Sequence, residues 1–294
     1  MKLQIRLLCL LAACWSVTAA AKPRQMYVDG PYGQIHLRID GPAAGPPVIL
    51  LHKMFWSAVQ FEHVQGVLAD RGIFSVAVDI PGYGGSDAPP AEPTTAQYAA
   101  ALVPVFDSLK IRRAFVLGVD TGSSVALAFA DQYPERVEAL ILDGAPIFDA
   151  ATARKLIDAP HFDRTPLPGG ETLARRWQAV RSIIGPDQAS DANVQASVLQ
   201  FFAASPNWWW AHDAIFKYDF ATALKRVKTS GMLLSFPGGA LHTQEAQFMA
   251  IRPDFRLQPI AVGAYTTPSY DAPGVWAAAV ADYMLDVRPA LVER

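Results

Sequence analysis

The segment 118–122 reads GVDTG and places Asp120 between two glycines. Glycine on both sides of a polar residue is typical of a sharp turn from a strand into a helix, where the backbone is strained and the helix packs closely. The pattern is G-x-S-x-G with aspartate in place of serine. Such a turn holds the central side chain above the sheet and directs the backbone amide of Thr121 into the same space. A carboxylate there suits nucleophilic displacement, because it is ionised at neutral pH without a base. The alternative is that Asp120 caps the following helix.

The elements that must position this turn alternate regularly. Near-continuous apolar segments predict strands, and helical segments follow near 57–69, 94–109 and 122–133. This alternation predicts a parallel sheet that is covered by helices on both faces. An antiparallel entry hairpin is predicted at 27–28 and 35–39, where apolar and polar residues alternate around a glycine-containing turn. The predicted strands of the sheet are 48–51, 73–79, 114–120, 137–143, 231–236 and 255–262.

The regular alternation is lost between residues 146 and 222, where prolines interrupt the helical pieces. A long excursion between two strands of a regular sheet predicts an inserted helical lid, because ligands in open α/β sheets bind beyond the carboxyl ends of the strands. Trp208, Trp209 and Trp210 lie near the end of this segment. They are candidates to line an apolar pocket, with packing as the alternative.

Three further motifs accompany the GVDTG turn. Residues 50–52 read LLH, residues 79–87 read DIPGYGGSD, and residues 133–137 read YPERV. Together these motifs resemble the α/β-hydrolase superfamily over nearly all of the chain after residue 21. The resemblance implies a mostly parallel eight-stranded sheet covered by helices, with a core at 22–145 and 223–294 and a helical lid at 146–222.

An aspartate at the turn resembles the haloalkane dehalogenases and epoxide hydrolases of that superfamily. In that branch the carboxylate attacks an sp³ carbon, and a histidine then activates water against the ester. The rest of the triad departs from the pattern. Ala264 or Tyr265 occupies the place of the family's histidine, and no histidine follows His242. The sequence PGGA at 237–240 replaces the family's acid, so Asp143, at the end of the next strand, is the alternative acid.

The loop after His52 also departs from the family's His-Gly sequence, because Lys53 and Met54 follow the histidine. A backbone amide donor remains there, while Lys53 adds a cation that can neutralise Asp120, bind an anionic substrate or stay solvated. His242 is the best candidate for the missing base, with helix capping as the alternative. The candidate catalytic residues are therefore Asp120, Asp143 and His242, and the candidate oxyanion and binding residues are Lys53, Met54, Thr121, Trp208, Trp209, Trp210 and Tyr265.

The first 21 residues predict a signal peptide. Basic residues precede an apolar segment at 7–17 that is too short to span a bilayer, and an A-x-A pattern ends at Ala21. We expect cleavage there and release into the periplasm of a Gram-negative-type cell, or secretion. The alternative is a lipobox, LAAC, that ends at Cys14 and would make the protein a lipoprotein. Both cysteines lie in this segment, so the protein without it has no disulfide and no thiol nucleophile.

Composition limits the partners. The chain has 294 residues, a formal net charge of −2 and 51% hydrophobic residues. This excludes a disordered chain and gives no basic footprint for nucleic acid. No apolar stretch outside the leader is long enough for a membrane span, and oligomeric state is not indicated. No phosphate loop, dinucleotide fingerprint or metal-ligand cluster occurs, so no cofactor or metal is expected, and the expected partner is a small molecule.

Two classes of function remain open. The first is a hydrolase that acts on a small or medium apolar substrate, through an aspartyl ester or through water activated by Asp120. The second is a triad-deficient relative that binds a ligand or catalyses a lyase or isomerase step. Fold alone does not decide between them, because one fold supports many functions.

Overall fold

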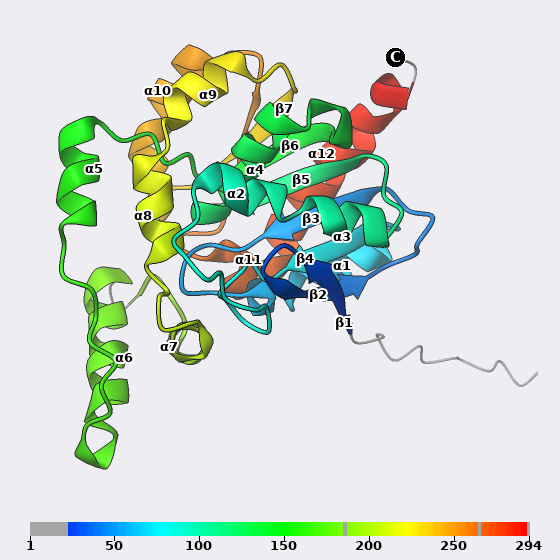
Figure 1. Cartoon of the computed structure of the whole chain (residues 1–294). Coiled ribbons are helices and arrows are strands. Elements are labelled where there is room, and N and C mark those ends of the chain that lie inside the picture. Colours follow the sequence, from blue (N-terminus) through cyan, green and yellow to red (C-terminus); the bar gives the residue numbers. More distant parts are fainter. Residues whose placement is uncertain (1–22, 185–186, 264–265, 293–294) are drawn as a thin grey trace, which may run out of the picture.

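The computed structural model describes residues 23–184, 187–263 and 266–292 and contains an eight-stranded sheet between two helical layers (Figure 1). The strand order is β1-β2-β4-β3-β5-β6-β7-β8. β2 pairs antiparallel with β1 and β4, and all other neighbouring strands are parallel. This confirms the predicted α/β-hydrolase architecture. The strands are β1 (Arg24–Gly30), β2 (Gly33–Asp40), β3 (Pro47–Leu51), β4 (Phe74–Val78), β5 (Ala114–Val119), β6 (Val137–Asp143), β7 (Gly231–Ser235) and β8 (Arg256–Pro259).

Helices bury one apolar core on each face of the sheet. On one face, Tyr98, Phe106 and Phe129 from α2, α3 and α4 pack with alternate side chains of the strands. On the other face, Leu68 of α1 and Trp276 of α12 do the same. In Figure 1, α2, α3 and α4 lie in front of the sheet and α12 lies behind it. The helices are α1 (Val64–Asp70), α2 (Thr95–Ala100), α3 (Val103–Ser108), α4 (Thr121–Gln132), α10 (Glu245–Ile251), α11 (Pro268–Asp271) and α12 (Pro273–Val292).

Three predicted elements differ in extent from those observed. The single helix expected at 94–109 is two helices, because Pro104 near the start of α3 lacks the N–H that a continuous helix needs. Residues 57–69 form a short 3₁₀ helix, Ala58–Phe61, before α1. The last strand is shorter than predicted and ends at Pro259, which cannot donate to a sheet ladder.

The segment between β6 and β7 forms the helices α5 (Ala150–Ile157), α6 (Glu171–Ile184), α7 (Asp191–Ala203), α8 (Trp210–Lys217) and α9 (Phe220–Arg226). α5, α6 and α7 project away from the sheet, on the left in Figure 1. α6 and α7 have an apolar cluster of their own, formed by Val180, Val194 and Val198. α8 and α9 contribute to the main core beneath them through Ala211 and Leu224, and α7 contributes Phe201 to the same core.

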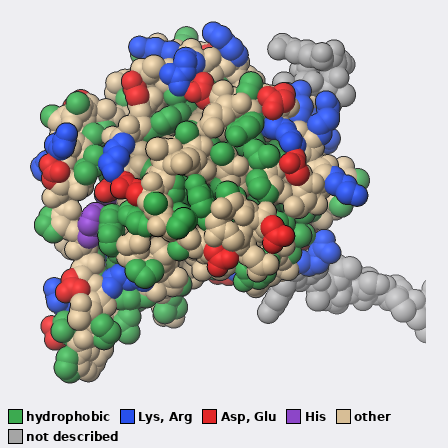
Figure 2. Space-filling view, in the orientation of Figure 1, with side chains coloured by type: hydrophobic (Ala, Val, Ile, Leu, Met, Phe, Trp, Pro, Cys, Tyr) green, Lys and Arg blue, Asp and Glu red, His purple; other side chains and the backbone are tan. Residues whose placement is uncertain are grey.

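The surface carries both signs of charge. On the face in Figure 2, acidic and basic side chains occur among hydrophobic ones. In the described ranges, no helix has the length and apolar character that crossing a membrane requires.

Candidate active site

Asp120 lies at the turn between β5 and α4 with a left-handed backbone, φ 48° and ψ −106°. The glycines around it are required by close contacts. A Cβ on Gly118 would lie 2.2 Å from backbone atoms of Gly122, and a Cβ on Gly122 would lie 2.2 Å from the Leu51 carbonyl oxygen. The Asp120 carboxylate makes no capping hydrogen bond to α4, so the helix-capping alternative is wrong. The turn therefore presents a half-buried carboxylate that helix formation does not use.

A cavity of about 430 Å³ opens over this turn. It brings together five of the residues that the sequence singled out, and residues of the lid segment form another part of its wall. The predicted residues that line it are Lys53, Met54, Asp120, Asp143 and His242. Arg176, Val180, Ile184, Gln188 and Ser197 contribute from the segment between β6 and β7.

The carboxylates of Asp120 and Asp143 and the ammonium group of Lys53 act on one another in this cavity. Burial raises the pKa of Asp120, and the Lys53 charge opposes that rise. Burial lowers the pKa of Lys53, while Asp120, Asp143 and Asp271 favour its charged form. The Lys53 Nζ donates a hydrogen bond to Thr267 Oγ1. The expectation that the Lys53 side chain stays solvated is therefore wrong, because its ammonium group is buried and three carboxylates act on it.

Asp143 is also buried and has a shifted pKa. It is 5% exposed, and burial raises its pKa to about 6 despite a hydrogen bond from Trp276 and the Lys53 charge. The Trp276 Nε1–H donates to Asp143 Oδ2 over 2.8 Å. The backbone also links the two acids, because the Asp120 N–H donates to the Asp143 carbonyl oxygen. Asp143 thus stands beside Asp120 at the carboxyl ends of neighbouring strands.

The loop after β3 supplies the backbone amides expected of an oxyanion site. The Lys53 N–H is already used, because it donates to the buried Gln60 side chain over 2.9 Å. The Met54 N–H has only a long bond, 3.3 Å, to Thr121 Oγ1. The Thr121 N–H is at the first position of α4, where no intrahelical acceptor exists. Met54 and Thr121 therefore offer two amides near Asp120.

His52 holds this loop in place and is not available as a base. Its Nδ1–H donates to the Lys53 carbonyl oxygen, and its Nε2 accepts from the Ile80 N–H. Burial lowers its pKa, which keeps the ring neutral.

His242 follows β7 and pairs with an acid that the sequence analysis missed. His242 Nδ1 lies 2.9 Å from Glu245 Oε1, and the other oxygen of Glu245 accepts from the Ser235 hydroxyl. His242 is not the N-cap of the helix that follows, because Gln244 holds that position before α10. Because Nδ1 is occupied, Nε2 is the nitrogen free to meet a ligand in the cavity. The spacing of three residues at the start of a helix was the available signal for this pair.

Trp208, Trp209 and Trp210 are not among the residues that line this cavity. Trp208 is 5% exposed and belongs to the main core, where its ring contacts Phe55 and Phe201. Trp209 stacks on His161. The expectation that these side chains form the pocket wall is thus wrong for the cavity at Asp120. Tyr265 lies outside the described residues.

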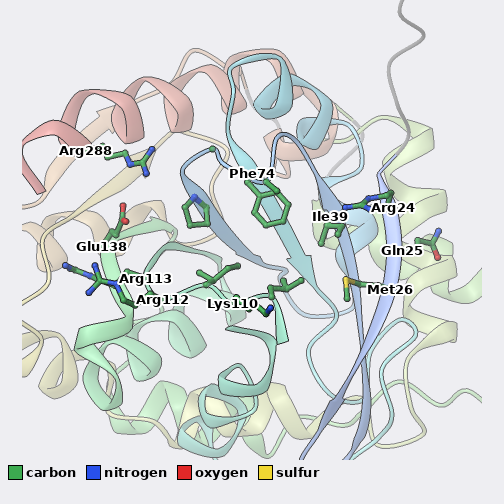
Figure 3. A pocket seen from close by; sticks show the side chains of 15 residues that line it. Arg24, Gln25, Met26, Ile39, Phe74, Lys110, Arg112, Arg113, Glu138 and Arg288 are labelled. Atoms are coloured by element: carbon green, nitrogen blue, oxygen red, sulfur yellow. The ribbon is translucent and has the colours of Figure 1, made fainter. Parts of the chain in front are cut away.

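A second cavity, of about 700 Å³, lies at the opposite edge of the sheet (Figure 3). It includes Pro47 and Phe74, the first residues of β3 and β4. One acid, Glu138, is surrounded there by basic side chains. These are Arg24, Lys110, Arg112, Arg113 and Arg288. Open α/β sheets bind ligands beyond the carboxyl ends of the strands, so its greater volume does not make it the reaction site.

Comparison with known proteins agrees with this architecture. The model of the alpha/beta hydrolase fold family matches residues 46–191. The chain belongs to the α/β-hydrolase superfamily.

Two curated relatives and one solved structure show which kinds of protein the chain is similar to. The chain is 32% identical over 109 residues to epoxide hydrolase 3 of Siraitia grosvenorii, which covers 36% of this chain and 34% of that protein. It is 31% identical over 128 residues to an uncharacterized carboxylesterase of Bacillus subtilis, 42% of each chain. The chain therefore spans less than half the length of these curated relatives. An epoxide hydrolase structure from Vigna radiata has a TM-score of 0.69 at 18% identity, covering 90% of this chain and 98% of that one.

Proposed function

We propose that the protein is a hydrolase that forms an ester on Asp120. The observation that carries this proposal is the strained elbow, which holds a carboxylate in a cavity without using it to cap α4. In the first step an Asp120 oxygen attacks an sp³ carbon of a haloalkane or epoxide. The carbon–halogen or carbon–oxygen bond breaks, and its electron pair leaves with the halide or the epoxide oxygen. The relative named as an epoxide hydrolase supports the epoxide part of this chemistry.

The second step is hydrolysis of the aspartyl ester. Water attacks the carboxyl carbon of Asp120, and His242 Nε2 accepts the proton while Glu245 stabilises the protonated ring through Nδ1. The amides of Met54 and Thr121 are placed to stabilise the oxyanion. Collapse of the intermediate breaks the bond between the Asp120 carboxyl carbon and the ester oxygen, His242 returns its proton to that oxygen, and the carboxylate is restored as the alcohol leaves. The positive charge of Lys53 offsets the negative charges of the Asp120 and Asp143 carboxylates.

We further infer that residues 146–222 act as a lid over this site. Arg176 and Val180 of α6 and Ser197 of α7 line the cavity, so the segment faces the substrate directly. Export through a signal peptide at 1–21 remains part of the proposal, and that segment lies outside the described residues.

Intact-mass spectrometry after incubation with haloalkanes, epoxides and activated esters tests the proposal. We expect an adduct that peptide mapping places on Asp120 and that is absent in Asp120→Asn and Asp120→Ala. The alanine variant controls for deamidation of the new amide. His242→Ala should slow breakdown of the adduct by about 10²–10⁴-fold, the usual worth of a general base.

The matched control is His63→Ala, because His63 contacts Tyr270 outside the cavity. Turnover that is unaffected by Asp120→Asn would reject the aspartyl-ester mechanism. Specific ligand binding without adduct or turnover would favour a binding or non-hydrolytic role.

A further inference from the structure

Arg176 is a buried cation in the wall of the candidate active site. It lies on α6, is 5% exposed, and lines the cavity that contains Asp120. Three aromatic rings surround its guanidinium carbon, at 3.9 Å from the ring centre of Phe201, 4.5 Å from Phe55 and 5.3 Å from Phe162. The sequence analysis did not single it out, because the position of α6 over the sheet depends on the tertiary fold.

This guanidinium has no anionic partner in the described part of the chain. Its Nε is buried without a hydrogen-bond partner. The one neighbouring charge that acts on it is Arg164, which repels it and is itself bonded to three backbone carbonyls. Burial lowers the pKa of Arg176 to about 10, so the group remains charged at neutral pH. The Arg176 guanidinium is therefore a buried positive charge that no acid among the described residues pairs with.

A buried charge is costly unless it is paired, and arginines in protein interiors are normally paired with acids. The three rings offset part of this cost through cation–π contact, but the described residues supply no acceptor for the buried Nε–H. The N–H donors of a guanidinium form a planar fork that matches the two oxygens of a carboxylate. Lys53 does not compete for such an anion, because Asp120, Asp143 and Asp271 already act on it.

We infer that the substrate carries a carboxylate that binds Arg176, with an apolar body that extends toward Asp120. The inference rests on the proposed function, because the reacting carbon of the substrate is taken to lie at Asp120. The anionic end of the substrate lies at Arg176 of α6, in the part of the cavity wall that the segment between β6 and β7 supplies. Phe55, Val180 and Phe236 supply apolar wall for the body of the molecule. Arg176 is thus a specificity-determining residue for anionic substrates.

Binding of a matched ligand pair tests this inference without turnover. The probes are 4-phenylbutanoate and its neutral amide, 4-phenylbutanamide, measured by isothermal calorimetry with Asp120→Asn protein at pH 7. We expect the carboxylate to bind at least about tenfold more tightly than the amide, because charge-assisted hydrogen bonds are the stronger ones. Arg176→Gln in the same background should remove this preference.

Arg175→Gln is the matched control. Arg175 precedes Arg176 on α6 and is exposed, so this variant loses the same charge outside the cavity and should keep the preference. Arg176→Met preserves the aliphatic bulk and provides a second variant if the glutamine variant does not fold. Equal affinity for both probes in the Asp120→Asn protein, or a preference that survives loss of Arg176, would overturn the inference.

The outcome is separable from that of the aspartyl-ester proposal. Carboxylate-selective binding without any adduct in the wild-type protein would support Arg176 and reject the nucleophile. An adduct on Asp120 that forms equally fast with 4-chlorobutanoate and 4-chlorobutanamide would support the nucleophile and reject Arg176 as the anion site.

Discussion

Replacing Trp276 by Phe tests the electrostatics of the site through Asp143. The substitution removes the indole N–H that donates to Asp143 Oδ2 over 2.8 Å and leaves the carboxylate buried. A hydrogen bond to a charged group contributes about 1.5–3 kcal/mol, and one to a neutral group about 0.5–1.5 kcal/mol. The ionised form should therefore lose about 1.4 kcal/mol more than the protonated form, which corresponds to about one pH unit. The pKa of Asp143, about 6 in the wild-type protein, should rise by that amount.

The same change has a defined sign for stability. The pKa of Asp143 is raised from its ordinary value in the unfolded chain to about 6, so its contribution to folding is fully present below pH 4 and is lost as pH rises through about 6. That loss is on the order of 3 kcal/mol. Trp276→Phe should increase it, so the variant should be destabilised more at pH 8 than at pH 4.5.

Urea unfolding at pH 4.5 and pH 8 measures the two free energies of unfolding, and carbon-13 NMR of the Asp143 carboxyl measures its pKa. Trp56→Phe is the matched control, since Trp56 is equally buried and packs on Tyr270. Equal destabilisation of Trp276→Phe at both pH values, with an unchanged Asp143 titration, would refute the reasoning.

Three further outcomes are expected. Gly118→Ala should lower the free energy of unfolding in urea by about 3 kcal/mol or more, because its Cβ would lie 2.2 Å from the Gly122 backbone. Gly66→Ala in α1 is the control and should be neutral or stabilising, because its Cβ would have no atom within 4 Å. Equal effects of the two variants would contradict the elbow contacts. Trp208→Ala should cost about 3–5 kcal/mol because the side chain is in the core, and Trp210→Ala, which is half-buried, should cost less; a Trp208 variant of normal stability would place the ring outside the core. Mass spectrometry of the protein made in a Gram-negative host should show an N-terminus at Lys22, and a diacylglyceryl group on Cys14 would contradict this.

Local sequence predicted the strand segments of the core and the elbow, because buried parallel strands are short apolar runs and the turn needs glycines at fixed positions. Asp120, Asp143 and Lys53 were predictable for the same reason, since each follows a recognisable strand. The break between α2 and α3 was also visible in the sequence as Pro104.

The remaining features of the site depend on contacts between distant segments. Trp276 meets Asp143 across 133 positions, and Arg176 reaches the cavity only through the fold of the lid segment. The place of Trp208 was predicted wrongly for another reason. An aromatic residue in a helical segment gives the same sequence pattern whether it lines a pocket or packs in a core. The pairing of His242 with Glu245 had a spacing signal, but its position in the cavity depends on where β7 ends.

The backbone conformation at Asp120 also bears on the stability of the fold. At φ 48° and ψ −106°, a residue with a side chain costs about 1–3 kcal/mol, and glycine removes most of that cost. Asp120→Gly should therefore unfold at higher urea concentration than the wild-type protein while it loses the adduct. The aspartate at this position is therefore a cost to folding that capping of α4 does not offset, and the difference in urea midpoint between the two proteins measures that cost.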